Sequence, residues 1–379
     1  MNQKVQLTSV QIISLMSTSF MPLMFWYFPR IAVEHSLYDA QWSVLGVFLT
    51  GFLMAFLHGA LNERFPNVHP VDVHTLVLGK WLGTVTASIF IPTYLGFLAT
   101  SIYLYSILIK FSFPNTPKYA IIGALCLVAF RGSWTGIASL AGVASIVYPL
   151  TWIGVGVSSL MSLFQGERFW LTTHVADWMK TADGIYALLP LYLGFTVVLV
   201  LNQYHLPKQR IRLWYPIITV LGANIVMAIP FLATLIDIGW HPNLHITFPV
   251  QYILELIRLR NGIIERMGIL IILLSTMFIT LYTSIQMWAI SDGIAKILRM
   301  KEDRFKVISI VSLVIVFVTS ILYSNSDQAF YMVKMFLTPI SWALLIGSPI
   351  LLLSVAMIRR VKVKLEPQNA SSPSSQTEQ

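Results

Sequence analysis

Charged residues are scarce in this chain: only 11% of its 379 residues are Asp, Glu, Lys or Arg, whereas 56% are hydrophobic. Soluble globular proteins carry about 25% charged residues, so this deficit excludes an ordinary soluble domain. The hydrophobic residues also form long runs with few interruptions. Because a bilayer core about 30 Å thick requires roughly 20 apolar residues per helix, these runs predict an all-α integral membrane protein.

The chain has a single cysteine, Cys126, which excludes an intramolecular disulfide. It also lacks the C-x-x-C, H-E-x-x-H, Walker A and G-x-S-x-G patterns that hold metals, phosphates or catalytic nucleophiles. These absences indicate that the protein is not an enzyme, and they give no reason to expect a cofactor or a metal ion. Acidic residues are missing from the middle of the predicted spans, which argues against a proton-driven carrier. A sodium site built from backbone carbonyls with Ser158, Thr283 or Ser284 remains open.

About ten segments are predicted to cross the membrane, and together they form a single transmembrane domain over residues 1–365. The two halves of this domain, roughly 9–164 and 184–357, contribute five spans each. A further short helix, Pro249–Arg260, is predicted to lie along the outer surface, because its apolar residues recur at helical spacing. The predicted spans are 9–33, 41–61, 81–109, 119–130, 134–164, 184–202, 213–236, 267–291, 307–323 and 335–357.

The net charge of +9 is interpreted as a topology signal rather than as a nucleic-acid site. With an inside N-terminus and ten spans, most Lys and Arg residues fall in segments on the cytoplasmic side, as the positive-inside rule requires. Both termini are therefore predicted to be cytoplasmic, and the basic segments are expected to attract anionic membrane lipid. The tail, residues 366–379, is rich in Ser, Pro and Gln and is predicted to be disordered.

Two predicted spans carry helix-breaking residues at equivalent places in the two halves. The first span is predicted to be interrupted at Met16–Pro22 and the sixth at Leu189–Gly194. Proline removes a backbone donor, and glycine adds backbone freedom. Matched interruptions of this kind are typical of inverted-repeat transporters, in which the freed peptide groups bind substrate near the middle of the membrane. The alternative is that the prolines only kink these helices.

Several short motifs occur in an order and spacing typical of one protein family. The motifs are Phe28-Pro29-Arg30, Arg64-Phe65-Pro66, Gly79-Lys80-Trp81-Leu82-Gly83, Pro114-Asn115-Thr116-Pro117 and Ile263-Ile264-Glu265-Arg266. Across about residues 5–360 the chain resembles the B subunits of nutrient germination receptors from endospore-forming bacteria, the GerAB-like family. That family is a branch of the amino acid–polyamine–organocation superfamily. The resemblance therefore implies a leucine-transporter-type fold, a 5+5 inverted repeat with helices 1 and 6 interrupted.

The resemblance also implies a function. Such subunits lie in the inner membrane of the dormant spore with A and C subunits, bind a small germinant such as an amino acid in a transporter-like pocket, and trigger germination. Two alternatives remain open: a stand-alone amino acid or amine permease, and a structural membrane partner with a vestigial pocket. The chain differs from its relatives at the first interruption, where Pro22-Leu23-Met24 replaces a common Gly-x-Gly. Thr196 also stands where relatives can carry a glutamate. Both differences disfavour an ordinary α-amino acid as the ligand.

The predicted ligand site consists of polar, aromatic and small residues on four spans that face the interruptions. Tyr282 and Gln286 lie four residues apart and therefore share one face of a helix. Serine and threonine hydroxyls often bond back to their own helix, so a purely structural role is the alternative for these residues. The predicted ligand-binding residues are Ser17, Thr18, Ser19, Met21, Tyr94, Phe97, Thr100, Leu191, Tyr192, Gly194, Tyr282, Thr283 and Gln286.

Overall fold

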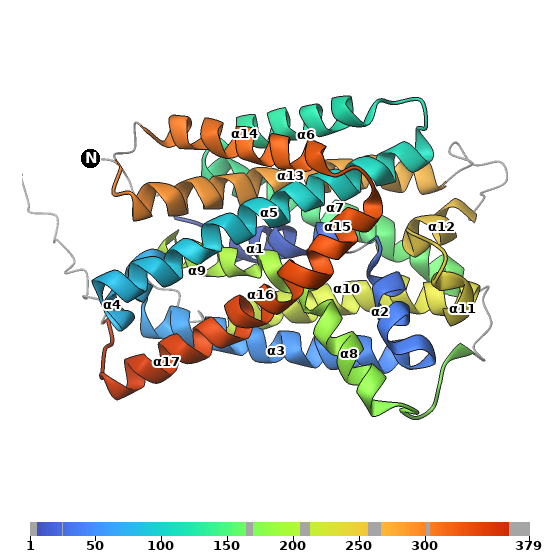
Figure 1. Ribbon diagram of the computed structural model, residues 1–379, viewed down its shortest axis with the longest axis horizontal. Coiled ribbons are helices and arrows are strands. Elements are labelled where there is room, and N and C mark those ends of the chain that lie inside the picture. The colour runs from blue at the N-terminus through green and yellow to red at the C-terminus, as the bar shows by residue number, and fades with distance from the viewer. Residues whose placement is uncertain are drawn as a thin grey trace, which may run out of the picture.

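Long apolar helices run side by side through the structure, a computed structural model that describes residues 6–24, 26–163, 170–204, 213–256, 267–300 and 304–363 (Figure 1). The α-helices are α1 (Ser9–Met24), α2 (Phe28–Ser36), α3 (Ala40–Arg64), α4 (Pro70–Leu78), α5 (Lys80–Ser112), α6 (Lys118–Ser133), α7 (Ile137–Leu163), α8 (Trp178–Leu188), α9 (Val197–Leu201), α10 (Trp214–Ile238), α11 (Trp240–Asn243), α12 (Pro249–Leu256), α13 (Met267–Ile297), α14 (Phe305–Leu322), α15 (Ser326–Met332), α16 (Thr338–Trp342) and α17 (Ser348–Ile358). Between them lie the 3-10 segments η1 (Leu37–Asp39), η3 (Leu189–Thr196) and η4 (Asn202–Tyr204), and the π-helical turns η6 (Val333–Leu337) and η7 (Ala343–Gly347).

Each of the ten predicted spans coincides with a helical segment. Within the described residues, 8 helical stretches are long and apolar enough to cross a membrane. The helices α1 and α6 are shorter, with 16 residues each, which corresponds to about 24 Å of helix. Helix α1 forms the first span together with α2, and α6 is the short fourth span. The prediction of a polytopic helical membrane protein is therefore confirmed.

The first span is interrupted later than the sequence predicted. Helix α1 continues through Pro22 to Met24, and α2 begins at Phe28. The predicted position, Met16–Pro22, was therefore wrong by several residues. Pro22 costs α1 only one backbone hydrogen bond, whereas Pro29 sits in the first turn of α2, where a proline favours a new helix start.

The sixth span is interrupted where the sequence predicted. Helix α8 ends at Leu188, and the chain continues as the 3-10 segment η3 before α9 begins. A 3-10 stretch inside a helix has poorer hydrogen-bond geometry and often marks a functional hinge. All eight residues of η3 are buried, so its carbonyl groups must find partners among the surrounding side chains.

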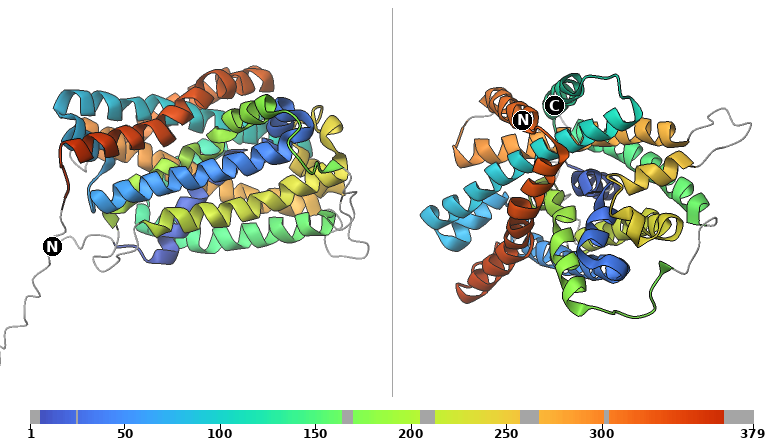
Figure 2. Two further views of the ribbon diagram at one scale, coloured as in Figure 1. Left: turned by 90° about the horizontal axis from the view of Figure 1, so that it is seen from below. Right: turned by 45° about the vertical axis from the view of Figure 1, so that its right-hand side comes forward.

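The two interrupted spans occupy the centre of the bundle. Helix α1 packs against α7, α10, α13 and η3, and the right-hand view of Figure 2 shows it surrounded by the longer helices. We call the end of the bundle that carries α4 and the end of α17 the α4 end, and the opposite end, which carries α11 and α12, the α11 end (Figure 1). The interruptions lie between these two ends.

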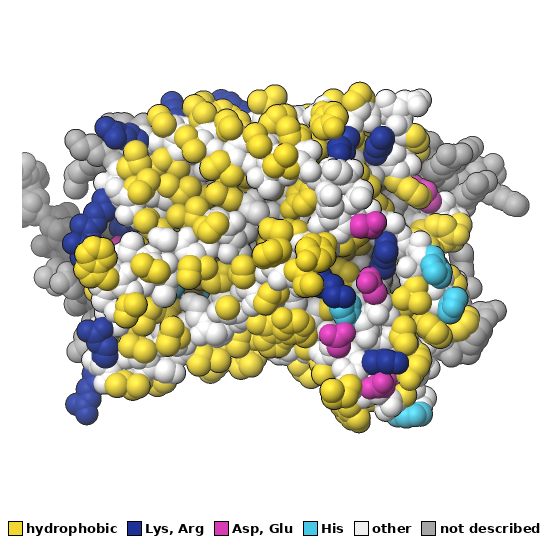
Figure 3. All heavy atoms as spheres, viewed as in Figure 1, with side chains coloured by type: hydrophobic (Ala, Val, Ile, Leu, Met, Phe, Trp, Pro, Cys, Tyr) yellow, Lys and Arg dark blue, Asp and Glu magenta, His cyan; other side chains and the backbone are white. Residues whose placement is uncertain are grey.

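The charged residues are unevenly distributed between the two ends. On the face shown in Figure 3, Lys and Arg lie at both ends of the bundle, including around α4 and the end of α17, whereas Asp, Glu and His lie mainly toward the α11 end. Arg64 has a specific partner at the α4 end: its Nε donates to the carbonyl oxygen of Val361 at 2.9 Å and its Nη2 to that of Ala356 at 2.8 Å. Arg64 thus satisfies carbonyl groups at and just beyond the C-terminus of α17.

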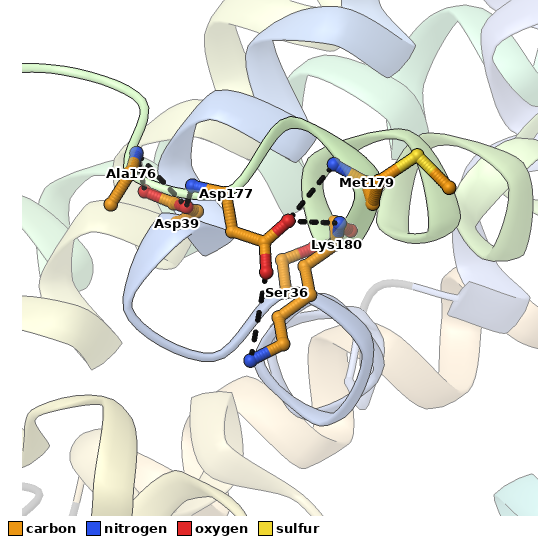
Figure 4. A network of polar contacts seen from close by, with 6 residues as sticks. All are labelled: Ser36, Asp39, Ala176, Asp177, Met179 and Lys180. Carbon is orange, nitrogen blue, oxygen red and sulfur yellow. Dashed lines mark hydrogen bonds and ion pairs between the residues drawn. The ribbon is translucent and has the colours of Figure 1, made fainter.

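A buried carboxylate joins the two halves of the chain at the α11 end. The side chain of Asp39 is fully buried and accepts hydrogen bonds from the backbone N–H groups of Ala176, at 3.1 Å, and Asp177, at 2.7 Å (Figure 4). Asp177 in turn caps α8 by accepting from the N–H groups of Met179 and Lys180. These contacts fix the start of α8 on the corner between α2 and α3.

The predicted surface helix is present as α12, but it is not confined to the surface. Val250, Ile253 and Leu254 are buried against the bundle, because the apolar stripe that predicted a helix also packs inward. The remainder of the predicted helix, residues 257–260, lies outside the described residues, as do the motif Ile263–Arg266 and the tail 366–379.

Candidate ligand site at the two helix interruptions

The interrupted spans touch each other at Gly194 and Ser19. A Cβ atom placed on Gly194 would lie 1.8 Å from the carbonyl oxygen of Ser19, a distance that no side chain tolerates. Only glycine allows η3 to approach α1 this closely. The contact places backbone carbonyl groups of both spans beside the same side chains of α13 and α5.

Gln286 on α13 bridges the two spans. Its Nε2 donates to the carbonyl oxygen of Ser19 at 2.5 Å and lies 3.5 Å from that of Gly194. The side chain is only 1% exposed, and its Oε1 has no hydrogen-bond partner in the described structure. Leaving a buried acceptor unsatisfied costs about 1–3 kcal/mol, so Oε1 is a ready acceptor for a ligand N–H or O–H group.

Tyr94 on α5 holds the opposite side of η3. Its hydroxyl contacts the carbonyl oxygen of Leu193 and the hydroxyl of Thr196. Gln286 and Tyr94 therefore replace helical partners that the 3-10 segment has lost. Because both side chains also line the adjoining cavity, a molecule there would meet the same groups that hold the interruption in place.

A cavity of about 80 Å³ extends from Gln286 toward the α4 end. Its walls come from α4, α5, α13 and the segment around α9. This volume is below the roughly 300–1,000 Å³ of typical small-molecule sites, so it accommodates only a small ligand without movement of the helices. The lining includes no Asp, Glu, Lys or Arg; its polar side chains are His69, His74, Tyr94, Thr196 and Gln286, and the rest is apolar.

Helix α4 closes the cavity at the α4 end, where two histidines lie. Nδ1 of His69 accepts from the N–H of Val71 at 3.2 Å, so its proton sits on Nε2, which donates to Asp292 on α13 at 3.1 Å. Nδ1 of His74 donates to the carbonyl oxygen of Pro70 at 2.9 Å. Burial lowers the pKa of His74 below its usual value of 6.5, while the hydrogen bond to Pro70 opposes the shift.

The structure brings four of the predicted ligand-binding residues together: Ser19, Tyr94, Gly194 and Gln286. Other predicted hydroxyls bond elsewhere, chiefly to their own helices, as in the alternative considered for them. Thr18 donates to Ser14, Thr283 donates to Thr280, and Thr100 donates to Gly96 while contacting Tyr323. Ser284, which the sequence analysis considered for a sodium site, likewise donates to the carbonyl oxygen of Thr280. The side chain of Ser158, considered for the same site, is not among those that the structure describes.

The remaining predicted residues pack around the site without lining the cavity. The ring of Phe97 makes edge-to-face contacts with Tyr94 and Tyr282, each with ring centroids 6.3 Å apart. Tyr192 points toward α10, where its hydroxyl donates to Asn224 at 2.6 Å. Ser17 and Leu191 are buried, and the side chain of Met21 lies outside the description.

Several cavity residues were not predicted from the sequence. His69 and His74 lie in the segment between the second and third spans, which the sequence analysis treated only as a connection. The sequence did contain a sign that a helix begins here, because Pro70 follows the polar residue His69, a pattern typical of a helix start. The sequence analysis noted that Thr196 differs from relatives but did not include it among the predicted ligand-binding residues. Phe90 lies one helical turn before the predicted residue Tyr94 and was not predicted either.

Comparison with known sequences identifies one family. The sequence model described as "Spore germination protein" matches residues 6–329. Spore germination protein YndE of Bacillus subtilis (strain 168) is 25% identical over 137 residues, which cover 36% of this chain and 38% of that protein. The match thus spans well under half of the length of that relative.

Comparison with solved structures identifies the fold. The nucleobase-cation-symport-1 family transporter Mhp1, in a closed conformation with bromovinylhydantoin bound, superposes with a TM-score of 0.66 at 12% identity, covering 96% of this chain and 81% of that one. MhsT in complex with L-phenylalanine gives 0.62 at 13% identity, covering 94% and 99%. A substrate-bound, outward-open Na⁺-coupled sialic acid symporter gives 0.58 at 12% identity, covering 94% and 89%. At such low identity the likeness shows the fold alone, and it confirms the leucine-transporter-type architecture.

Proposed function

Because this chain belongs to the spore germination protein family, we propose that it is the nutrient-sensing subunit of a germination receptor. In this proposal it lies in the inner membrane of the spore, acts with A and C subunits, and triggers germination when a small germinant binds. The observation that carries the proposal is the bridge made by Gln286. One buried side chain joins both interrupted spans, lines the adjoining cavity and has an amide oxygen without a hydrogen-bond partner in the described structure.

Binding at this position would act directly on the contact between the two halves. A germinant N–H or O–H group that bonds to Oε1 of Gln286 changes the hydrogen bonding of the same amide that holds Ser19 and Gly194. A ligand shifts a conformational equilibrium only through a difference in its affinity for the two states. The germinant is therefore expected to favour the arrangement of α1 and η3 in which Oε1 is best placed for it.

The charge distribution supports a cytoplasmic α4 end. Arg64, Lys80, Lys296 and Arg359 lie at this end, in keeping with the positive-inside rule, and in this orientation both termini lie in the cytoplasm. With this orientation the 80 Å³ cavity lies on the cytoplasmic side of Gln286. Its uncharged lining favours a small ligand with a hydrogen-bond donor and an apolar body, rather than one whose recognition depends on an ion pair.

Two genetic measurements test the sensing role. Deleting the gene should abolish germination in response to at least one nutrient of a panel, while germination by a nutrient-independent stimulus is retained. Replacing Gln286 with Ala should raise the half-saturating concentration of that nutrient, because the ligand loses its acceptor. Thr283→Ala is the matched control on the same helix, since its hydroxyl bonds to Thr280 and does not line the cavity. An unchanged half-saturation for Gln286→Ala at normal protein level would remove this site.

A stand-alone permease is the second candidate function, since the chain has the fold of transporters. The two candidates differ in what the purified chain does by itself. In liposomes without other subunits, a permease accumulates a labelled amino acid or amine, whereas a sensing subunit does not. Uptake by the chain alone would therefore contradict the receptor proposal and support the permease.

A further inference from the structure

Two exposed histidines, His241 and His245, lie beside each other at the α11 end, where Figure 3 shows histidine side chains at the surface. Their ring centroids are 5.9 Å apart, and the ring planes make an angle of 60°. Neither residue lines the cavity beside Gln286. Among the described residues, the histidines that form ion pairs are His35 and His69. The imidazoles of His241 and His245 are therefore accessible to a ligand from solution.

The spacing of the pair is one that holds metal ions. In the H-E-x-x-H motif, two histidines four residues apart share one face of a helix and bind zinc, while the glutamate acts as a general base. Residues 241–245 of this chain read His-Pro-Asn-Leu-His, so the ligand spacing is present and Pro242 replaces the glutamate. This segment therefore has the metal-binding residues of the motif without its catalytic residue.

The fold fixes the backbone that carries the two histidines. Gly239 ends α10 with a φ of 80°, which turns the chain into α11. The side chain of Asn243 is fully buried, and its Nδ2 donates to the carbonyl oxygens of Gly239 at 2.8 Å and Thr234 at 3.2 Å. The backbone N–H of His245 donates to the carbonyl oxygen of Pro242 at 3.0 Å. Binding of an ion between the two rings thus requires rotation of side chains only, which keeps its entropic cost small.

The separation of the two rings fits a shared metal ion. Zinc lies about 2.0–2.1 Å from a ligating imidazole nitrogen and prefers tetrahedral geometry, which places two bound rings with their centroids roughly 5 Å apart. The observed 5.9 Å is slightly larger, and both side chains are exposed and able to rotate toward each other. Within the described part of the chain, no third His, Cys, Asp or Glu completes a metal cluster. Water would therefore occupy the remaining positions.

We propose that His241 and His245 form a binding site for a divalent transition metal ion, of which Zn²⁺ is the representative. Imidazole nitrogens suit Zn²⁺, Cu²⁺ and Ni²⁺, whereas Mg²⁺ and Ca²⁺ prefer oxygen ligands. Structural zinc sites are closed by four protein ligands. A site with two protein ligands leaves the ion accessible to water, so the metal exchanges with the surrounding solution.

Metal binding here would restrain the corner that follows the first interrupted span. The ring of Trp240 packs edge-to-face against His241, with centroids 5.3 Å apart, and against Tyr38, with centroids 6.3 Å apart. Tyr38 lies in η1, directly after α2, and α11 also packs against α2 itself. An ion that holds His241 to His245 would therefore stabilise α11 and its contact with this corner.

The test measures Zn²⁺ binding to the purified full chain by isothermal titration calorimetry. The protein is prepared with an affinity tag that contains no histidine, freed of metal with a chelator and held in nanodiscs of zwitterionic lipid. The variants are His241→Gln and His245→Gln, and His174→Gln is the matched control at another exposed histidine. A parallel titration uses Mg²⁺. Thermal unfolding without metal verifies that every variant is folded, and hydrogen exchange of the amides of Leu244 and His245 locates the bound ion.

Zn²⁺ should bind the parent and His174→Gln alike, and each of the other two variants should bind it at least about tenfold more weakly. Loss of even an outer-shell partner costs about 10–100-fold in metal affinity, and here a ligand itself is lost. Zn²⁺ should slow exchange of the two amides in the parent, whereas Mg²⁺ should not. Three results overturn the site: no binding at millimolar Zn²⁺, unchanged affinity in His241→Gln and His245→Gln, or unchanged exchange of these amides in the Zn²⁺-bound parent.

Discussion

Gly194 and Ser19 are in direct backbone contact across the centre of the bundle, although they belong to different halves of the chain. The space for a side chain at Gly194 is occupied by the carbonyl group of Ser19, and Gln286 donates to that same carbonyl. The contact depends on Gly194 in the 3-10 segment η3, because packed helices otherwise keep their backbones apart by the width of their side chains. The central position of this contact makes it the first target for mutation.

Gly194→Ala should destabilise the protein by about 1–3 kcal/mol, because the added methyl group overpacks a site with no room for it. The measurement is thermal unfolding of the purified chain in detergent or nanodiscs. Gly142→Ala is the control, since a Cβ atom there meets nothing within 4 Å. Equal unfolding temperatures for the two variants would show that α1 and η3 are not in contact.

Tyr192→Phe should cost about 1–3 kcal/mol, even though the residue does not line the cavity. Its hydroxyl donates to Oδ1 of Asn224 at 2.6 Å, and both side chains are buried. Removing the hydroxyl leaves that oxygen without its donor. Tyr186→Phe, at a residue with 43% exposure, serves as the control in the same unfolding assay. A loss no greater than that of the control would contradict a structural role for the Tyr192 hydroxyl.

Asp39→Asn should loosen the start of α8. The carboxylate accepts from two backbone N–H groups, and in an amide one of the two acceptor oxygens is replaced by an NH₂ group that can only donate. The expected cost is about 2 kcal/mol, because hydrogen bonds to charged groups are worth about 1.5–3 kcal/mol.

Hydrogen exchange by mass spectrometry measures the effect of Asp39→Asn locally. Exchange of the amides of Ala176 and Asp177 should accelerate, whereas Glu63→Gln, at an exposed carboxylate on α3, should leave it unchanged. Unaltered exchange in Asp39→Asn would mean that other contacts hold this segment.

The stability of α4 should depend on pH through His74. Its pKa is lowered in the folded protein, so the unfolded chain binds a proton more readily. The stabilisation associated with neutral His74 is therefore complete above about pH 6.5 and is lost as the pH falls from there toward the lowered pKa. The unfolding temperature of the parent should thus fall more between pH 7.5 and 5.5 than that of His74→Gln, in which His69 is retained. Equal falls would show that His74 does not titrate in this way.

The sequence by itself determined the class of structure. The scarcity of charge and the length of the apolar runs require helices that cross a membrane, because the backbone must satisfy its own hydrogen bonds in lipid. The position of η3 was equally local, since Pro190 and Gly194 interrupt their own span. The choice of Ser19, Tyr94 and Gln286 as site residues followed from their polarity on spans expected to face the centre.

Only the tertiary structure decided where the first interruption falls and what surrounds each site. Pro22 remains inside α1, because a single proline does not by itself determine where a packed helix ends. Tyr192 and Tyr94 are both aromatic residues near an interruption, yet one bonds to Asn224 and the other faces the cavity. The cavity between α2, α8 and α15 at the α11 end is lined by both Arg30 and Lys334, which lie near opposite ends of the sequence. No local pattern encodes such a pairing, since it depends on how α2 and η6 pack around the same space.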